Sequence, residues 1–301
     1  MPRKRKGNPV HGWVVLDKPY ELGSTSAVGK VRWLFTAQKA GHAGTLDPLA
    51  TGVLPIALGD ATKTVPFLVD AIKGYDFTLT FGQNTDTWDA EGEVTDTSDV
   101  RPTQTDIINV LPGFIGDIEQ IPPRFSAIKV GGKRSYDLAR SGKVVELKSR
   151  QVQIETINLT EFTPDAATFS VVCGKGTYIR SIARDLAASL GTCGHVTMLR
   201  RTRVGPFTLE HAFSLDALEQ LCHRGGVLEG LRPVETALDD IPVLAITDKD
   251  VSDLKQGRAI VLSPSSKLEK SEWILAMCGD KAIALCKPDA GQLWPKRVFN
   301  I

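Results

Sequence analysis

The feature that most constrains this chain is a glycine-rich stretch over residues 39–63, which lies between two apolar segments. A proline disfavours helical backbone in the residue before it, so Pro48 predicts an extended Asp47 whose carboxylate is presented rather than buried in a helix. The alternative is an ordinary helix start, with Asp47 as the N-cap and Pro48 at the first helical position. Three glycines of the stretch permit tight turns and a close approach of the backbone to a ligand: Gly41, Gly44 and Gly52.

Residues 44–48 resemble the GTLDP signature of the TruB family of tRNA pseudouridine synthases, in which the aspartate is the catalytic nucleophile. The resemblance therefore implies that role for Asp47. Three more segments similar to the family follow in the expected order: 73–82, 173–191 and 199–207. The match is strong from about Gly12 to Phe207 and thinner beyond. It implies isomerisation of uridine 55 in the T stem-loop of tRNA, by base flipping and by cleavage and re-formation of the glycosidic bond. Because this reaction has no net redox change and donates no group, we expect no cofactor.

Length and composition predict a folded protein with one large and one small domain. The chain has 301 residues, of which 42% are hydrophobic and 24% charged, and single cores stop growing near 250 to 300 residues. We expect an α+β fold. After a basic flexible tail over 1–11, the resemblance implies a catalytic domain over 12–242, with a central mixed, largely antiparallel β-sheet flanked by helices. Short strands predict a small β-rich domain over 243–301, which the resemblance identifies as PUA-like and RNA-binding.

The sequence also excludes several classes of protein. No apolar run approaches the roughly 18 residues that span a bilayer, and the basic N-terminus lacks the apolar core of a signal peptide. We therefore expect a cytoplasmic protein with no membrane partner, and a monomer. The five cysteines form no C-x-x-C pair and the five histidines are scattered, so we expect reduced thiols and no metal site. The turn over 59–63 lacks the spacing of a phosphate-binding loop.

Charge is distributed unevenly along the chain. Residues 84–120 carry nine acidic residues against one basic, and residues 124–150 carry eight basic residues against two acidic. Such polarity can present one positive face to phosphates, although two solvated faces are the alternative. We expect the acidic part over 84–100 to form a hairpin or loop that turns away from RNA. The glycine-flanked segment 124–150 has the composition of a mobile flap, and it resembles the TruB insertion that closes over the T loop.

Basic residues from several segments are therefore expected to bind RNA. Five lie in the flap and three lie outside it: Arg124, Lys129, Lys133, Arg134 and Arg140, then Lys18, Arg200 and Arg201. His42, five residues before Asp47, would fill the stack vacated by the flipped base, as the matching family histidine does. A structural histidine in a glycine-rich turn is the alternative for His42.

Two further segments contribute candidate pocket residues. Apolar and polar residues alternate over 73–82, which predicts a strand with Tyr75 on its apolar face. From this pattern alone, Tyr75 is a core aromatic. The matching tyrosine of the family stacks on the target base, and the resemblance implies that role for Tyr75. Residues 178–190 have the periodicity of a helix, with Thr177 as a plausible N-cap. Arg180 and Arg184 lie one turn apart, which is usually solvated surface charge.

The segment 174–191 resembles the TruB motif GTYIRSIARDLG, although the helix here is longer before its glycine. The family arginine pairs with the catalytic aspartate, which implies that Arg180 pairs with Asp47 and that Tyr178 lines the pocket. Residues 199–207 match the last catalytic motif, in which the leucine, here Leu199, lines the uridine pocket.

Other local elements follow from turn and capping residues. We expect a strand over 12–16, a turn over 17–19 and then a helix capped by Ser24 or Ser26. Residues 213–238 have a helical pattern, and residues 287–291 have the composition of a turn.

Two other functions are compatible with parts of this sequence. One is an RNA-binding or RNA-folding protein with a vestigial signature. The other is a glycoside hydrolase, which normally needs a second carboxylate about 5 to 10 Å from the first. Asp60 and Asp185 are the available candidates, and no motif pairs either of them with Asp47.

Overall fold

A large mixed sheet forms the body of the protein. The computed structural model describes residues 7–126, 129–130, 133–134, 147–263 and 267–301. Seven strands make the main path of a nine-stranded sheet, in the order β1 (Gly12–Lys18), β3 (Thr51–Leu58), β12 (Gly194–Val204), β4 (Lys73–Phe81), β11 (Ala166–Cys173), β10 (Arg150–Thr163) and β7 (Gly116–Gln120). Two short strands complete it, β2 (Ala40–His42) beside β3 and β13 (Phe207–Thr208) beside β12.

Strand pairing in this sheet is antiparallel except between β3 and β12, which run parallel. The expected α+β fold with a mixed, largely antiparallel sheet is therefore confirmed. The register of β12 places Arg201 opposite Gly52 on β3 and opposite Tyr75 on β4. The same strand pairs Leu199 with Phe77. A long strand in the middle of the sheet thus brings together residues from three distant parts of the sequence.

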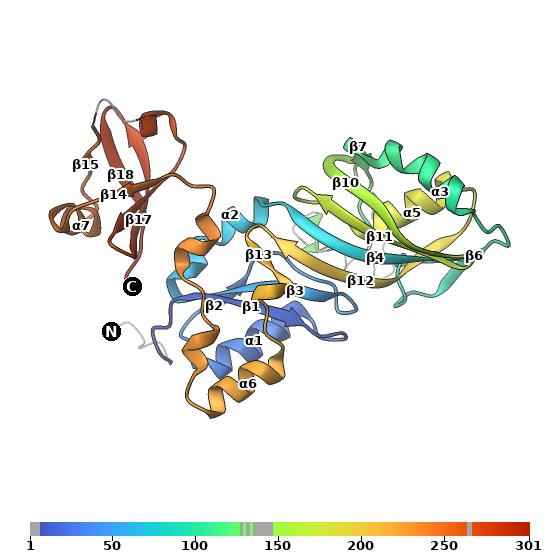
Figure 1. Cartoon of the computed structure of the whole chain (residues 1–301), viewed down its shortest axis with the longest axis horizontal. Helices are drawn as coiled ribbons and strands as arrows, with labels where there is room; N and C mark the ends of the chain where they lie inside the picture. Colours follow the sequence, from blue (N-terminus) through green and yellow to red (C-terminus); the bar gives the residue numbers. More distant parts are fainter. Residues whose placement is uncertain (1–6, 127–128, 131–132, 135–146, 264–266) are drawn as a thin grey trace.

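Helices cover the two halves of the sheet separately (Figure 1). The helix α5 (Ile179–Ser189) packs with β4, β10 and β11, together with α3 (Gln104–Val110), around a core that includes Phe77, Phe169 and Ile182. The helices α1 (Ser24–Leu34) and α6 (Leu215–His223) pack under β1 and β3 around a second core. Tyr75 and Leu199 pack against both cores, so they lie at the seam between the halves.

A third core joins the body to the C-terminal sheet. It contains Trp13 and Phe207 from the body together with Leu285 of β17 and Phe299, which directly follows β18. The short helix α2 (Val65–Asp70) and the 3₁₀ turn η1 (Gly59–Lys63) lie at this junction. Lys63 Nζ donates to the Val298 carbonyl at 2.6 Å, and Asp60 accepts from the Asn300 amide at 2.6 Å.

The C-terminal sheet has five strands of its own, consistent with the expected small β-rich unit. Their order is β14 (Val243–Ala245), β16 (Ile274–Cys278), β17 (Lys281–Asp289), β18 (Gln292–Val298) and β15 (Ile260–Val261), and α7 (Asp248–Lys255) packs beside β17 and β18. Residues 287–289 belong to β17 rather than to the predicted turn, which is confined to Ala290 and Gly291, both with positive φ.

Several local expectations were wrong at element ends. The strand β1 continues through Asp17 and Lys18, which pair with β3, so the turn begins later than predicted. Ser24 does not cap α1, whose N-cap is Gly23 without a side-chain hydrogen bond. Thr177 does not cap α5 either, because its hydroxyl donates to the Gly174 carbonyl and the N-cap is Tyr178.

The helical pattern over 213–238 is divided into three pieces. The helix α6 ends where Gly225 takes a left-handed conformation, at φ +78°. Two 3₁₀ turns follow, η4 (Val227–Gly230) and η5 (Val234–Leu238), with Pro233 before the second. Two more 3₁₀ turns occur at η2 (Leu111–Phe114) and η3 (Leu209–His211), and another at η6 (Lys267–Lys270). Within the described ranges, no helix combines the length and apolar character needed to cross a bilayer.

Candidate active site

Asp47 lies in the connection between β2 and β3, at the edge of a small pocket. Residues 47–50 form a turn closed by a hydrogen bond from the Ala50 amide to the Asp47 carbonyl at 3.1 Å, so the alternative of a helix start is excluded. The Asp47 side chain is 41% exposed. The expectation of a presented carboxylate is therefore met by this geometry.

The residue before Asp47 is fixed by a buried serine. Ser24 Oγ accepts from the Leu46 amide at 2.9 Å and donates to the Leu46 carbonyl at 2.8 Å. Both hydrogen bonds are buried, and this use of the hydroxyl explains why Ser24 does not cap its own helix. The first residue of α1 thus positions the backbone next to the carboxylate.

The residue after Asp47 is fixed by a buried lysine. Lys18 Nζ donates to the carbonyls of Pro48 at 3.0 Å, Leu22 at 2.7 Å and Pro19 at 3.0 Å. Burial lowers the pKa of Lys18 to about 8, and the nearby charge of Asp47 opposes that shift. The expectation that Lys18 binds RNA is corrected, because this side chain is wholly buried and serves the turn instead.

Arg201 supports the same loop from the sheet. Its side chain is buried, with Nε donating to the Val53 carbonyl at 2.7 Å and a terminal nitrogen donating to the Gly44 carbonyl at 3.2 Å. The expected contact of Arg201 with RNA is therefore corrected, because burial separates its charge from solvent. Gly52 is needed here, since its φ is +98° and a Cβ would lie 2.2 Å from the Arg201 carbonyl oxygen. The close approach is to a strand rather than to a ligand.

Arg180 reaches Asp47 from the first turn of α5. Its Nη2 lies 2.8 Å from Asp47 Oδ2 and its Nη1 lies 3.3 Å from Asp89 Oδ2. Two backbone carbonyls accept further hydrogen bonds from the guanidinium, those of Thr87 and Phe125, each at 2.9 Å. The side chain is 5% exposed, so Arg180 is not the solvated surface charge that its spacing alone suggested. Instead it is a buried donor that contacts two carboxylates, those of Asp47 and Asp89, and two backbone carbonyls.

Asp89 is a site residue that the sequence did not single out. It lies after β5 (Gln83–Thr85) and before β6 (Val94–Thr97), and Thr87 Oγ1 donates to its Oδ1 at 2.6 Å. The expectation that residues 84–100 turn away from the RNA site needs correction, because the connection between β5 and β6 packs on Arg180. Asp89 stood among nine acidic residues, and nothing in that run distinguished a buried carboxylate from solvated ones.

The arrangement also bears on the hydrolase alternative. Asp60 pairs with Lys63 at 3.0 Å and Asp185 pairs with Arg184 at 2.6 Å, and neither lines the pocket at Asp47. The second carboxylate near the site is Asp89, which is buried and committed to Arg180 and Thr87. It is thus placed as a partner of the arginine rather than as a separate acid.

Gln120 clamps the backbone of Tyr178, two residues before Arg180. Its side-chain oxygen accepts from the Tyr178 amide at 2.8 Å and its nitrogen donates to the Tyr178 carbonyl at 3.1 Å. Ser181 Oγ donates to the Ile121 carbonyl at 2.8 Å, which ties the same turn of α5 to the end of β7. Gln120 carries no sequence signal, because its role depends on β7 lying beside the start of α5.

The pocket itself brings together three of the five predicted catalytic and pocket residues. Asp47, Arg180 and Leu199 line it, together with Asp89, Leu49 and Thr197 among others. Tyr75 lies behind it at the seam of the two cores, and burial raises the pKa of Tyr75, with the charge of Arg201 opposing the shift. The Arg150 guanidinium stacks over the Tyr178 ring, with its Cζ 4.9 Å from the ring centroid. Neither tyrosine belongs to the pocket lining.

His42 ends β2, ahead of the turn that carries Asp47. Burial lowers the pKa of His42, and the charge of Arg201 adds to that shift. The Gly44 backbone opposes the shift, but the buried Nδ1 makes no hydrogen bond of ordinary geometry within the described residues. The ring is partly exposed, which leaves an accessible surface beside the site.

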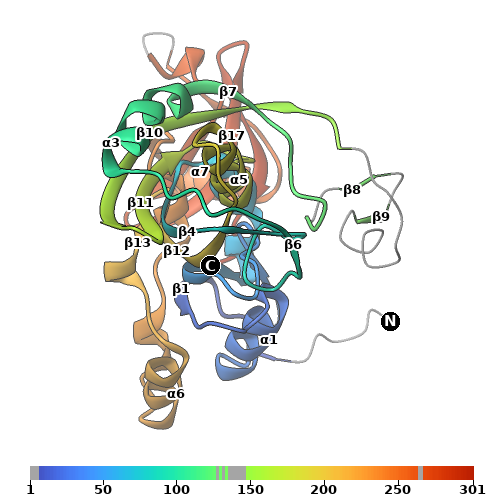
Figure 2. The ribbon, with the colours of Figure 1, turned by 90° about the vertical axis from the view of Figure 1, so that its right-hand side faces the viewer.

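The remaining basic residues that were expected to bind RNA differ in exposure and in how far the structure describes them. Arg124 is exposed, and Arg200 is partly exposed and pairs with Asp17 at 2.7 Å. Strands β8 (Lys129–Val130) and β9 (Lys133–Arg134) pair with each other and stand apart from the large sheet (Figure 2). The side chains of Lys129, Lys133 and Arg134 are outside the described part, as is all of Arg140.

Comparison with known proteins assigns this chain to a family. The model of the N-terminal domain of TruB family pseudouridylate synthases matches residues 32–179, and that of the tRNA pseudouridylate synthase B C-terminal domain matches residues 180–239. A protein of Caulobacter vibrioides named tRNA pseudouridine synthase B is 56% identical over 310 residues, with 100% of both chains covered. The chain belongs to the TruB family. It is therefore a pseudouridine synthase, and the resemblance seen in the sequence is confirmed.

Other TruB relatives and solved structures agree with this assignment. A protein of the same name from another Caulobacter strain is 57% identical over 311 residues, and one from Rhodospirillum rubrum is 48% identical over 308, each covering 100% of both chains. The crystal structure of a Cbf5-Nop10-Gar1 complex matches with a TM-score of 0.72 and 29% identity, over 92% of this chain and 78% of that chain. An H/ACA RNP bound to a substrate RNA matches with a TM-score of 0.74 at 24% identity, which supports the fold.

Proposed function

We propose that this enzyme converts uridine 55 in the T loop of tRNA to pseudouridine. The relatives that match it over their full lengths are named tRNA pseudouridine synthase B. The observation that carries the proposal is the 2.8 Å contact between Arg180 Nη2 and the partly exposed Asp47 carboxylate, in a pocket lined by Leu199. It places residues from three of the four matching segments, Asp47, Arg180 and Leu199, around one pocket.

The chemistry requires one carboxylate and no external group. The N1–C1′ bond breaks, the base turns, and C5 joins C1′, with the C5 proton lost and a proton gained at N1. Asp47 is the group that acts on the sugar, by attack at C1′ or by removing the C2′ proton to form a glycal. A primary kinetic isotope effect with uridine deuterated at C2′ would identify the glycal route, and its absence would favour attack at C1′.

Arg180 and Asp89 hold the carboxylate in place for this step. The guanidinium makes four contacts with fixed partners, two of them backbone carbonyls, so it has little freedom to move away from Asp47. Preorganised charge of this kind stabilises a reacting group without reorganisation during the reaction. Asp89 supplies the countercharge that keeps a buried arginine in this position.

The other predicted residues have roles around the flipped base. Leu199 would form an apolar wall for the uracil ring, and Tyr75 would stack on it from the seam of the sheet and assist removal of the C5 proton. Tyr178 would close the pocket after its ring leaves Arg150. His42 would fill the stack that the base has vacated, because a flat, partly exposed ring beside the site suits that position.

Phosphate contacts would come from the remaining basic residues and from the C-terminal sheet. Exposed Arg124 and partly exposed Arg200 are candidates in the described part, and Lys129, Lys133, Arg134 and Arg140 are candidates from the sequence. Residues 243–301 would act as a PUA-like domain that contacts the same tRNA. Binding should weaken as salt rises, because phosphate contacts release counterions. A flat salt dependence would contradict the proposal for the 124–150 segment.

The cellular form we propose is a monomer in the cytoplasm that works without metal or cofactor. Sedimentation at micromolar concentration should give the mass of one chain. Activity should be unchanged by a chelator, and a loss of activity that added metal restores would contradict this part of the proposal.

The decisive experiment replaces Asp47 with asparagine. Asp47→Asn keeps the size and the partial exposure of the side chain, so tRNA should bind within about twofold of wild type, while pseudouridine formation should fall by at least about 1,000-fold. The product is measured by tritium release from tRNA labelled at uridine C5. Normal turnover by Asp47→Asn would show that another group performs the reaction.

The same assay separates the alternatives. An RNA-binding protein with a vestigial signature would bind tRNA without releasing tritium. A glycoside hydrolase would release free uracil, which pseudouridine formation does not. Mapping pseudouridine in tRNA from cells with and without the gene would test position 55 directly.

A further inference from the structure

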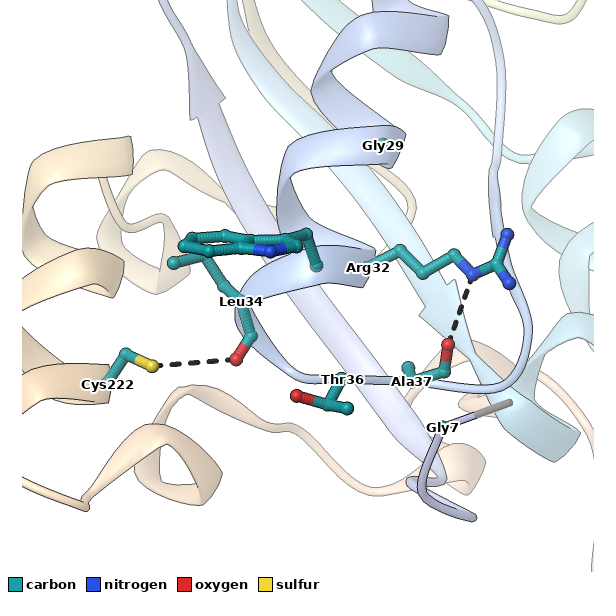
Figure 3. A pocket seen from close by; sticks show the side chains of 8 residues that line it. Gly7, Gly29, Arg32, Leu34, Thr36, Ala37 and Cys222 are labelled. Atoms are coloured by element: carbon teal, nitrogen blue, oxygen red, sulfur yellow. Dashed lines mark hydrogen bonds between the residues drawn. The ribbon is translucent and has the colours of Figure 1, made fainter.

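A second hollow lies at the far end of α1 from the catalytic site. Its volume is about 560 Å³, and it is bounded by Gly29, Arg32 and Trp33 on the helix, by Gly7 on the N-terminal segment and by Cys222 on α6. Figure 3 shows how two hydrogen bonds shape it: Arg32 Nε donates to the Ala37 carbonyl at 3.1 Å, and Cys222 Sγ donates to the Leu34 carbonyl at 3.6 Å. The walls are thus tied to the backbone at both sides.

Trp33 is the conspicuous side chain of this hollow. It is 75% exposed, more than any other aromatic side chain in the described part of the chain. The neighbouring Leu34 and Ala37 are buried, so the exposed apolar surface is confined to one large flat ring. A surface that small does not make a stable protein interface, which needs about 1,000 Å² or more. A flat ring does suit a single stacked base.

The charge around the ring favours an anionic partner. From residue 22 to residue 46 the sequence has three basic residues, Lys30, Arg32 and Lys39, and no acidic residue. All three are exposed, and Arg32 is the charged residue of the hollow's lining within the described residues. Within the described residues, the hydrogen bond of Arg32 is made by Nε, and its terminal nitrogens can donate to a further partner. In the sequence, four more basic residues, Arg3 to Lys6, directly precede Gly7.

The hollow is separate from the catalytic pocket, and helix α1 runs from the loop beside that pocket to the hollow. Ser24, at the first residue of α1, bonds Leu46 beside Asp47, whereas Trp33 lies in the last turn of the helix. The helix has 11 residues, and at 1.5 Å per residue its two ends are about 15 Å apart. An RNA with one base at Asp47 has to span a distance of this order to place another nucleotide at Trp33.

We propose that this hollow is a second RNA-binding site, in which an unpaired base of the substrate RNA stacks on Trp33 and an adjacent phosphate contacts Arg32 and Lys30. The proposal rests on the proposed tRNA substrate and adds a contact remote from the reacting uridine. The combination of an aromatic face with flanking cations is the general means by which proteins bind unpaired nucleic acid. The contact contributes to affinity and takes no part in the chemical step.

Gly29 offers a sharper test than removal of the tryptophan. A Cβ at Gly29 would meet no atom within 4 Å, and the residue is exposed within a helix. Because most side chains favour a helix over glycine, substitutions here should fold well. Gly29→Glu places a carboxylate at the hollow, and Gly29→Gln places a neutral group of the same size there as a matched control.

The experiment measures the dissociation constant of whole tRNA at about 0.1 M salt, and separately the tritium release at saturating tRNA. Trp33→Ala should weaken tRNA binding roughly fivefold or more. Gly29→Glu should weaken it about fivefold, and Gly29→Gln should stay within about twofold. Turnover at saturating tRNA should be unchanged in all three variants, since none touches the pocket at Asp47.

Base stacking has its own readout in tryptophan fluorescence. Wild type should be quenched when tRNA binds, and Trp33→Phe should lose most of that quenching while it retains much of the affinity. Wild-type tRNA affinity in both Trp33→Ala and Gly29→Glu would overturn the proposal, as would equal effects of Gly29→Glu and Gly29→Gln. Failure of the proposed function is distinct, because it would appear as absent tritium release in wild type.

Discussion

Gln120 brackets Tyr178, accepting from its amide at 2.8 Å and donating to its carbonyl at 3.1 Å. Tyr178 is the N-cap of α5, and Arg180 in the first turn carries the guanidinium that meets Asp47. The orientation of this ion pair therefore depends on a side-chain amide at the end of a strand, β7. Gln120 is a positioning residue in this arrangement, because it touches the backbone that carries Arg180.

Gln120→Met should separate this positioning role from simple packing. Methionine keeps the volume of the buried side chain but makes neither hydrogen bond, so the start of α5 should shift and kcat should fall about tenfold. Binding of tRNA should stay within about twofold. The measurement is single-turnover tritium release, normalised to folded protein. Lower stability with unchanged kcat would show that Gln120 serves only the fold.

Ser24→Ala should loosen the turn before Asp47. Two buried hydrogen bonds to Leu46 are lost, and the unpaired backbone groups should lower the free energy of unfolding by about 2 kcal/mol. The matched control is Ser26→Ala, an exposed position on the same helix, which should change stability by less than about 0.5 kcal/mol. Urea unfolding of both variants tests this, and equal effects would contradict the role assigned to Ser24.

Arg201 and Arg124 should differ in how they affect RNA binding. Arg201→Met removes buried hydrogen bonds to Val53 and Gly44, so it should destabilise the fold by about 2 to 3 kcal/mol. It should leave the salt dependence of tRNA affinity unchanged. Arg124→Met alters an exposed charge and should reduce the slope of log affinity against log salt by about one. A smaller slope of log affinity against log salt for Arg201→Met would show that Arg201 contacts a phosphate after all.

Stability should depend on pH through two buried lysines. Burial lowers the pKa of both Lys18 and Lys73 from 10.5 to about 8. Below about pH 8 the folded and unfolded chains both bind these protons, so the lysines contribute no pH dependence there. Between about pH 8 and 10.5 the unfolded chain binds more protons, and the two lysines make the free energy of unfolding rise with pH.

Lys73→Met should remove its part of that rise. The free energy of unfolding in urea is measured for wild type and variant at about pH 7.5 and about pH 10. The readout is the difference between the two proteins at each pH, because other groups also titrate in this range. Burial raises the pKa of the Cys173 thiol to about 11, and this acts in the opposite direction. Identical pH profiles for wild type and Lys73→Met would contradict the shift.

Much of the fold could be read from local patterns. The alternation over 73–82 predicted β4, and the spacing over 178–190 predicted α5, because strand and helix periods appear directly in the order of apolar residues. The predictions failed mainly at element ends. Ser24 and Thr177 have the chemistry of helix caps, but both hydroxyls are engaged elsewhere by tertiary or loop contacts.

The candidate site was predicted unevenly for a related reason. The motifs identified Asp47 and Arg180, whose contact the structure contains, yet they gave no sign of Asp89 or Gln120. Lys18 and Arg201 were misjudged because a basic side chain looks the same in sequence whether it is buried or exposed. Burial turns such a residue from a phosphate ligand into a donor for backbone carbonyls.

The sequence by itself determined the family, many of the strands and helices, and the aspartate of the segment Gly44–Pro48. These depend on residue type and spacing, which are local properties of a chain. Only the tertiary structure decided what surrounds that aspartate: Ser24 and Lys18 on its two neighbours, Arg201 beneath the loop, and Arg180 with Asp89 across the pocket. The physical reason is that burial and hydrogen bonding depend on which strands become neighbours, and β12 brings them together across about 150 residues of sequence.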